Sequence, residues 1–140
     1  MNPAEAVLAL LRGRGQTLAV AESLTGGLLS ATIVDVPGAS KAFRGGLVVY
    51  ATDLKATLAG VPPELLAAHG PVHPDVAAAL AGGARRRCTA DWGLATTGVA
   101  GPDGLGLVRG LELNGDRAAI RRQAVAGALD LLIGVLREAG

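Results

Sequence analysis

The chain has 140 residues, half of them hydrophobic, and a formal net charge of +1. Its longest basic run is Arg85–Arg87, so it lacks the broad cationic surface of nucleic-acid-binding proteins. No apolar run approaches the ~20 residues of a membrane span, and the start of the chain lacks the cationic region of a signal peptide. We therefore expect a single domain over residues 1–140 that is cytoplasmic and has neither nucleic-acid nor membrane partners.

The spacing of apolar and helix-breaking residues predicts helices that alternate with strands. Four helices are predicted over residues 2–15, 25–34, 74–88 and 116–137. Two shorter helices are also predicted. One is capped by Asp53 and carries Lys55, and the other spans residues 62–70. Strands are predicted over 17–22, 46–52, 90–97 and 108–113, with a glycine-rich turn at 98–104. This alternation favours an α/β fold with a layered sheet that is at least partly parallel.

The segment 38–55 concentrates unusual chemistry. It holds both lysines of the chain, Lys41 and Lys55, and the single tyrosine, Tyr50, whereas the other eleven basic residues are arginines. A lysine amine can lose its proton and act as a base, which arginine does not do in proteins. Together with Ser40, these side chains could supply a nucleophile, a base and a donor for acyl chemistry if the fold brings them within ~3 Å of one another. The alternative is that Ser40 caps a turn and Tyr50 belongs to the core.

Two turns that follow predicted strands have the composition of binding sites. Glu22, Ser23, Thr25 and Gly26 lie where a strand leads into a helix, and free N–H groups there can bind an anion. Ordinary helix capping explains the same residues equally well. The second turn, residues 96–102, combines Thr97 with glycines that allow a nucleotide to approach. Taken alone, this second turn is better explained as a tight connection.

Metal binding is not predicted. The lone Cys88 has no ligand spacing around it, and Gly70-Pro71 separates His69 from His73, so the two histidines share no helical face. Asp116 is a plausible cap of the last helix, and Arg117 beside it is a candidate phosphate ligand or a solvated helix residue.

Four motifs in order resemble one family. They are AESLTGG, DVPGASKAFRGGLVVYATDLKATLAGV, TTGVAGPDG and GDRAAIRRQAV. Together they are similar to the C-terminal domain of competence/damage-inducible protein A, whose members include nicotinamide mononucleotide deamidases. The resemblance runs from about residue 17 to 136. It implies a three-layer α/β/α sandwich with a mixed, largely parallel sheet, no cofactor or metal, and a homo-oligomeric assembly.

The resemblance also implies an activity and a site. The activity is hydrolysis of the carboxamide of nicotinamide mononucleotide to nicotinate mononucleotide and ammonia, in pyridine nucleotide recycling. Ser40 would be the nucleophile, Lys55 its base and Tyr50 an assistant. The substrate-binding residues would be drawn from the turns and the last helix: Glu22, Ser23, Thr25, Gly26, Thr97, Gly98, Gly101 and Arg117.

Three departures from the family pattern stand out. Leu24 replaces a cysteine at a position expected to be packing, and Gly70-Pro71-Val72-His73 replaces Gly-Ala-Val-Ser, which removes a hydroxyl helix cap. After Gly104, about one strand and its loop are missing, which would open the sheet or remove a pocket wall. The alternative function is therefore a catalytically impaired nucleotide-binding or interaction module.

Overall fold

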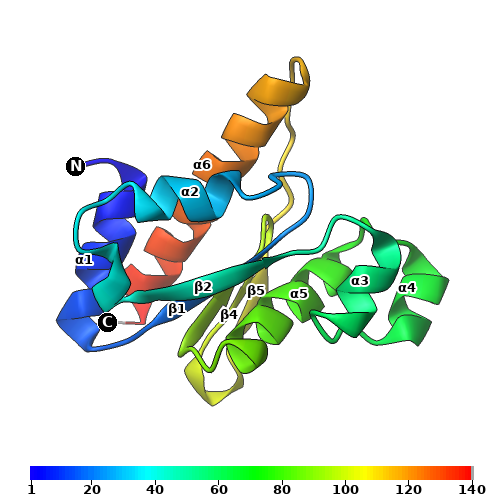
Figure 1. Ribbon diagram of the computed structural model, residues 1–140, viewed down its shortest axis with the longest axis horizontal. Coiled ribbons are helices and arrows are strands. Elements are labelled where there is room, and N and C mark those ends of the chain that lie inside the picture. Colours follow the sequence, from blue (N-terminus) through cyan, green and yellow to red (C-terminus); the bar gives the residue numbers. More distant parts are fainter. Residues whose placement is uncertain (140) are drawn as a thin grey trace.

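The computed structural model describes residues 1–139, and Figure 1 shows helices packed around a central sheet. The α-helices are Pro3–Arg14 (α1), Leu28–Val34 (α2), Thr52–Thr57 (α3), Pro63–His69 (α4), Pro74–Arg87 (α5) and Arg117–Glu138 (α6). The strands are Leu18–Glu22 (β1), Phe43–Val48 (β2), Trp92–Leu94 (β3), Gly98–Ala100 (β4) and Gly106–Val108 (β5). Two single 3-10 turns lie at Ala39–Lys41 (η1) and Pro102–Gly104 (η2).

The sheet is mixed, as expected, with strand order β2-β1-β3-β4-β5. β1 pairs in parallel with β2 and β3, whereas β4 pairs antiparallel with β3 and with β5. The parallel pairings therefore occupy one half of the sheet and the antiparallel pairings the other. The carboxyl ends of β2, β1 and β3 meet at one edge, which is where α/β sheets bind ligands.

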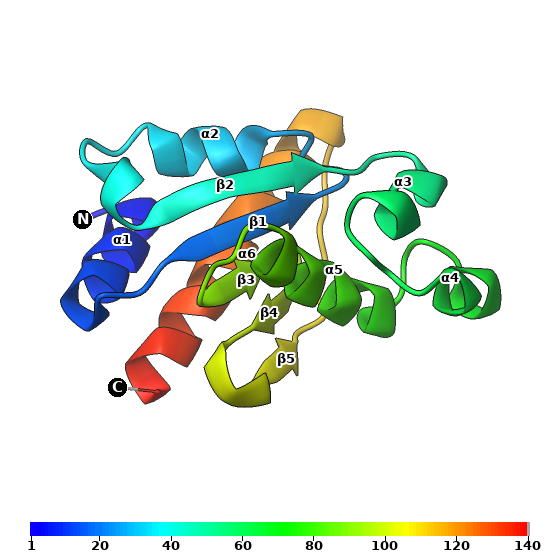
Figure 2. The ribbon, with the colours of Figure 1, turned by 60° about the horizontal axis from the view of Figure 1, so that its bottom comes forward.

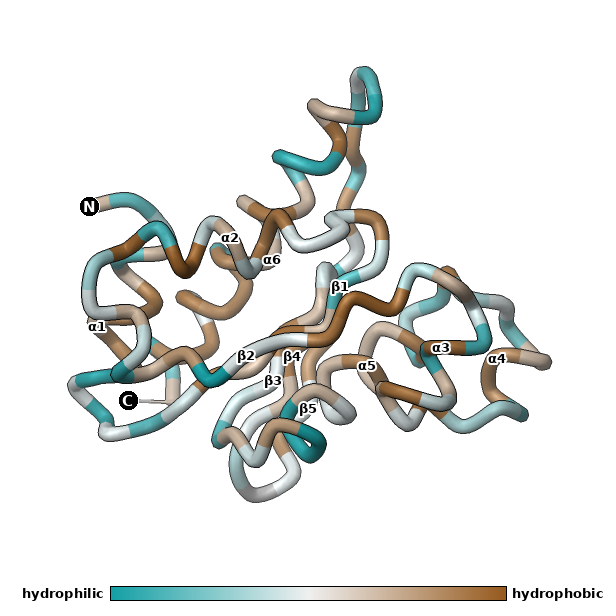
Figure 3. Tube along the Cα trace, viewed as in Figure 1, coloured by the Kyte–Doolittle hydropathy of each residue, from teal (hydrophilic) through white to brown (hydrophobic). Residues whose placement is uncertain are grey.

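Helices cover both faces of the sheet and complete a three-layer α/β/α arrangement, as Figure 2 shows from the side. On one face, α1, α2 and α6 pack over the larger residues of the strands, such as Leu18, Val20 and Trp92. On the other face, α5 packs over Ala19, Ala21 and Ala95. The first turns of α6 project away from the sheet and carry both hydrophilic and hydrophobic residues (Figure 3).

Two glycines of the sheet, which have no side chain, let α5 lie close to the strands. A Cβ atom at Gly93 would come within 1.9 Å of the carbonyl oxygen of Ala81, and one at Gly98 within 2.7 Å of that of Ala77. These separations are far below van der Waals contact. The glycines of β3 and β4 therefore set how deeply the N-terminal half of α5, which borders the site described below, sits on the sheet.

The structure corrects three predicted elements. The second strand runs over Phe43–Val48 instead of 46–52, because its partner β1 ends at Glu22, which pairs with Val48. Residues 98–100, predicted as part of a turn, form β4, and Thr96-Thr97 is the two-residue turn of a hairpin closed between Ala95 and Gly98. The fourth predicted strand, 108–113, is replaced by β5 and an irregular connection to α6.

Candidate active site

Polar side chains from two segments meet beyond the carboxyl edge of the parallel strands. Ser23 directly follows β1, and Lys55 lies in α3, which follows β2. The Lys55 Nζ atom donates a hydrogen bond to Ser23 Oγ at 3.1 Å. The two residues are 32 positions apart in sequence, so this contact exists because parallel β1 and β2 end side by side.

Lys55 is held in place by main-chain oxygens. Its Nζ donates to the carbonyl oxygen of Val49 at 2.8 Å and to that of Tyr50 at 3.1 Å. The residue is only 2% exposed, and no carboxylate of the described side chains, those of residues 1–102 and 104–139, forms an ion pair with it. Burial therefore lowers the pKa of the Lys55 amine, which brings the neutral form, the one that can accept a proton, closer to physiological pH.

Glu22 shapes the turn that carries Ser23. Its fully buried carboxylate accepts hydrogen bonds from the side-chain hydroxyls of Thr25 (2.7 Å) and Ser30 (2.6 Å) and from the backbone N–H groups of Gly27, Leu29 and Ser30. Burial raises the pKa of Glu22, but the hydrogen bonds, first those from the Ser30 and Thr25 hydroxyls, outweigh it and hold the pKa below its ordinary value.

This arrangement corrects the expected role of Glu22 and Thr25. Both were predicted to bind substrate, but Glu22 is fully buried and Thr25 is 1% exposed, and their polar side-chain atoms are bonded to each other. They serve instead as the internal support of the Ser23 turn and of the start of α2. Gly26 is needed in the same turn because its φ of +57° lies in the left-handed region.

Arg121 of α6 holds the turn from outside. Its guanidinium donates to the carbonyl oxygens of Leu24 at 3.1 Å and Thr25 at 2.8 Å. This contact joins the last helix to the turn after the first strand, 97 positions away in sequence. No role was predicted for Arg121, although its position one helical turn after Arg117 in the GDRAAIRRQAV motif was a usable signal.

A cavity of about 350 Å³ opens at Ser23 and Lys55. One wall is the Thr96-Thr97 hairpin turn, and another is the segment from Pro71 to Pro74 that leads into α5. Val108, Gly110 and Leu111 close a further side. The lining is mostly apolar, with a few polar side chains among its residues, which is the usual composition of a small-molecule site.

The predicted glycines serve packing rather than ligand contact. Neither Gly98 nor Gly101 lines the cavity. A Cβ atom at Gly101 would lie 2.6 Å from the ring of Trp92, and Gly98 lies under α5 as described above. Thr97 does line the cavity, as expected. Leu24, which was expected to be packing, is instead 40% exposed at the cavity wall.

Ser40 lies at the wrong end of β2 for the role predicted for it. It belongs to the 3-10 turn before β2, is exposed, and borders a separate pocket with Phe43 and Arg44. Six residues of extended strand, roughly 20 Å at about 3.3 Å per residue, separate this turn from the end of β2 that leads to Lys55. The prediction that Ser40 and Lys55 meet is wrong, because the two residues flank opposite ends of one strand.

Two other predicted residues point away from the cavity. The side chain of Tyr50 is 66% exposed, and it follows β2 instead of lying within it, so its contact with Lys55 is made by its backbone carbonyl. Arg117 is exposed in the first turn of α6 and does not line the cavity. Asp116 caps that helix as expected, accepting from the N–H of Ala119 at 2.8 Å.

His73 replaces the hydroxyl cap that the family pattern places before α5. Its Nδ1 accepts a hydrogen bond from the N–H of Asp75 at 3.1 Å. The cap is therefore kept with different chemistry. Because His73 also lines the cavity, this exchange puts an imidazole at the cavity wall where family members would have a small hydroxyl.

Comparison with known families agrees with this architecture. The family model described as "CinA C-terminal domain" matches residues 2–108. The chain belongs to this family. A "CinA-like protein" of Frankia casuarinae is 52% identical over 144 aligned residues, which cover 90% of this chain and 33% of that protein. The chain thus spans about a third of the length of that curated relative.

Solved structures of the family share the fold. A competence/damage inducible protein CihA from Agrobacterium tumefaciens superposes with a TM-score of 0.85 at 26% identity, covering 96% of this chain and 95% of that one. A competence or damage-inducible protein from Enterobacter asburiae gives a TM-score of 0.90 at 24% identity and 96% coverage of both chains, a likeness that speaks for the fold alone.

The comparisons also bear on the shortened stretch after Gly104. The match to the Frankia protein has 144 aligned positions, whereas 90% of this chain is about 126 residues, so the relative has about 18 more residues within the aligned region. The family match itself ends at Val108, in β5. Both findings are consistent with a shortening between β5 and α6, next to the cavity wall. Within residues 1–139, no helix combines the length and the apolar character that a membrane crossing requires.

Proposed function

We propose that the chain is an amidohydrolase in which Ser23 is the nucleophile and Lys55 is its general base. The observation that carries the proposal is the 3.1 Å contact between Lys55 Nζ and Ser23 Oγ at the floor of an apolar cavity. A serine hydroxyl is a weak nucleophile unless an adjacent base takes its proton, and a buried lysine amine is one of the side chains that can serve in this way.

The three hydrogen bonds of Lys55 explain how the proton moves. A protonated amine donates to all three oxygens, those of Ser23, Val49 and Tyr50. In the neutral amine, two N–H bonds stay on the carbonyl oxygens and the lone pair is left facing Ser23 Oγ. The hydroxyl then donates to the amine, and its proton passes to Lys55 as Oγ attacks the carboxamide carbon. Lys55 returns that proton to the departing nitrogen, which leaves as ammonia.

Water completes the cycle by the same route. It attacks the acyl group on Ser23 Oγ, Lys55 accepts its proton, and the proton returns to Oγ as the carboxylic acid leaves. The developing oxyanion needs hydrogen-bond donors. The backbone N–H groups of Leu24 and Thr25, which follow the nucleophile directly, donate no hydrogen bond to any atom that the structure describes. We assign them this task.

The substrate proposed from the family resemblance is nicotinamide mononucleotide, converted to nicotinate mononucleotide in pyridine nucleotide recycling. Apolar lining residues, among them Ala77, Leu80 and Ala95, suit a flat aromatic ring, and Thr96 and Thr97 add hydroxyls to the lining. Lys55 and His73 are the lining side chains able to carry positive charge among those described. His73, rather than the distant Arg117, is therefore placed to meet an anionic part of the substrate.

A second function is favoured by one observation. The shortened connection after β5 leaves Val108, Gly110 and Leu111, all partly or largely exposed, as a wall of the cavity. A cavity with a weakened wall could bind a nucleotide without excluding water and turning it over. The chain would then be a nucleotide-binding or interaction module of the family.

Ammonia release from nicotinamide mononucleotide separates these functions. The purified chain is expected to release ammonia and nicotinate mononucleotide in equal amounts, and a Ser23→Ala variant is expected to bind the substrate in calorimetry while releasing none. Calorimetric binding without any ammonia from the unmodified chain would support the module instead. Neither binding nor release, from a chain whose circular dichroism and cooperative melting show that it is folded, would exclude both functions for this substrate.

A further inference from the structure

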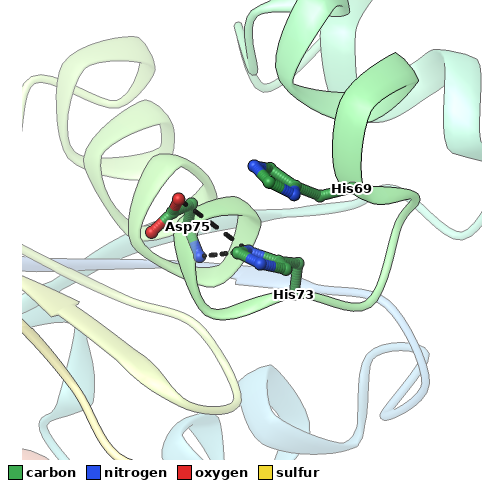
Figure 4. A group of neighbouring side chains, drawn as sticks. All are labelled: His69, His73 and Asp75. Carbon is green, nitrogen blue, oxygen red and sulfur yellow. Dashed lines mark hydrogen bonds and ion pairs between the residues drawn. The ribbon is translucent and has the colours of Figure 1, made fainter.

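A compact group of metal-ligand side chains lies beside the cavity. His69 ends α4, His73 precedes α5, and Asp75 lies in the first turn of α5 (Figure 4). One potential ligand atom from each residue lies within 4.8 Å of the others. The two histidines were predicted to lie apart because Gly70-Pro71 interrupts the helix. The loop between α4 and α5 in fact brings them back together, with their rings stacked at 3.9 Å between centroids.

We infer that His69, His73 and Asp75 form a binding site for a divalent transition-metal ion of the zinc class. Two imidazoles and one carboxylate are a ligand set typical of Zn²⁺, and three protein ligands leave a fourth position open. The same set does not suit Mg²⁺ or Ca²⁺, which take oxygen ligands. No step of the proposed amidase chemistry uses a metal, although His73 belongs both to this group and to the cavity lining.

The geometry needs only small changes to hold an ion. The Nδ1 atom of His73 and an oxygen of Asp75 are 3.9 Å apart, compared with about 3.3 Å between neighbouring ligands in a tetrahedral site whose bonds are 2.0–2.1 Å. His69 is exposed, so its ring can leave the stack and turn a nitrogen toward the ion without disturbing any packing. The ion coordinates the lone pair of His73 Nδ1. In the structure, this lone pair accepts a hydrogen bond from the Asp75 N–H.

The backbone around the site limits how far these ligands can separate. Pro71 stands in the loop and Pro74 is the first residue of α5, and proline fixes φ at both places. Ligands held close before binding lose less conformational freedom when the ion binds. Because His73 also lines the cavity, a bound ion lies at the edge of the pocket that contains Ser23 and Lys55.

The two histidines are the only ones in the chain, which makes a direct test possible. In a proton NMR titration of the full chain with Zn²⁺, the imidazole C–H signals of both histidines are expected to shift together and to reach their end point at one equivalent. Mg²⁺ at the same concentration is expected to leave both unchanged. Zn²⁺ that shifts neither ring, or one ring alone, overturns the site.

Variants identify the ligands. His69→Ala is expected to weaken Zn²⁺ binding, measured by competition with a chromophoric chelator, on the order of 100-fold, a loss at least as large as that for outer-shell partners of metal ligands. His73→Ser is expected to do the same while a hydroxyl still caps α5. Cys88→Ser, which removes the chain's free thiol, is the matched control and is expected to bind as the parent does. Unchanged affinity in the His69→Ala variant, or loss of binding in the Cys88→Ser variant, would contradict the assignment.

Discussion

The two ends of β2 look similar in sequence and differ in chemistry. Each end has a serine and a lysine near it: Ser40 and Lys41 at the start of the strand, Ser23 and Lys55 beyond its end. At the start, both side chains are exposed. Beyond the end, the lysine is buried, its pKa is lowered by burial, and its amine contacts the serine hydroxyl. Burial at the carboxyl edge of parallel strands, and not the presence of the residue types, is what distinguishes a candidate catalytic pair from a solvated one.

Replacing the two lysines is expected to give the largest difference in activity between the two ends of β2. Lys55→Met removes the proposed base and keeps most of the apolar stem, so ammonia release from nicotinamide mononucleotide is expected to fall about 10²–10⁴-fold, the usual worth of a general base. Lys41→Met is the matched control and is expected to retain the parent rate. Equal rates in the two variants, measured on proteins with the same melting temperature, would remove Lys55 from the mechanism.

A Glu22→Gln variant tests whether the buried carboxylate stabilises the turn that carries Ser23. Glu22→Gln replaces an acceptor-only carboxylate with an amide whose NH₂ faces donors, so the free energy of unfolding is expected to fall by about 3 kcal/mol. The pKa of Glu22 is lower in the folded chain. Its stabilisation is therefore fully present above the ordinary value of 4.5 and lost as pH falls through the folded value.

Urea unfolding of the Glu22→Gln variant at neutral pH checks this expectation. Asp53→Asn, at an exposed position in the first turn of α3, is the control and is expected to unfold within about 0.5 kcal/mol of the parent. If both variants unfold at the parent's urea concentration, the buried carboxylate does not hold the turn.

The pH dependence of turnover tests the protonation state of Lys55. Because burial lowers the pKa of the amine below 10.5, kcat/KM is expected to rise about tenfold per pH unit at low pH and to level off at a pH below that ordinary value. The protonated, buried amine also costs stability at low pH, a cost relieved as pH rises through the folded pKa. A rate that falls with rising pH over this range would be incompatible with a neutral amine as the base.

Replacing two arginines of α6 is expected to give the smallest effect, a difference in the free energy of unfolding. Arg121→Ala breaks two hydrogen bonds to the Ser23 turn and is expected to lower the free energy of unfolding by about 1–2 kcal/mol. Arg117→Ala, four residues earlier on the exposed first turn, is expected to change it by less than about 0.5 kcal/mol. Thermal unfolding of both variants measures this difference in stability. A larger loss of stability in Arg117→Ala than in Arg121→Ala would contradict the roles assigned to the two arginines.

Local sequence signals predicted most of the helices because their caps are local. Asn2 caps α1 and Asp116 caps α6, each by accepting a backbone N–H three residues ahead. The strand bounds were less predictable, because pairing decides them: β2 ends where β1 ends, and β4 exists because it pairs with β3. The α/β class and the carboxyl-edge location of the site could thus be predicted, but the length of each strand could not.

The prediction of the serine that contacts Lys55 failed for the same reason, because the pairing of strands decides which residues meet. Ser40 and Lys55 are 15 positions apart in sequence and Ser23 and Lys55 are 32 apart, so proximity along the chain favoured Ser40, whereas the contact in the folded chain is with Ser23. The rule that ligands bind at the carboxyl edge would have excluded Ser40, which precedes its strand. The meeting of His69 and His73 was missed for a related reason, because a loop can join two residues that no single helix face can.

A direct comparison of Ser23→Ala with Ser40→Ala tests the central claim, that the reactive serine is the one at the carboxyl edge. Both variants remove one hydroxyl and nothing else, and ammonia release from nicotinamide mononucleotide is measured for each beside the parent chain. The expected result is a loss on the order of 10³-fold or more for Ser23→Ala and an unchanged rate for Ser40→Ala. Full activity in Ser23→Ala together with loss in Ser40→Ala would contradict the account.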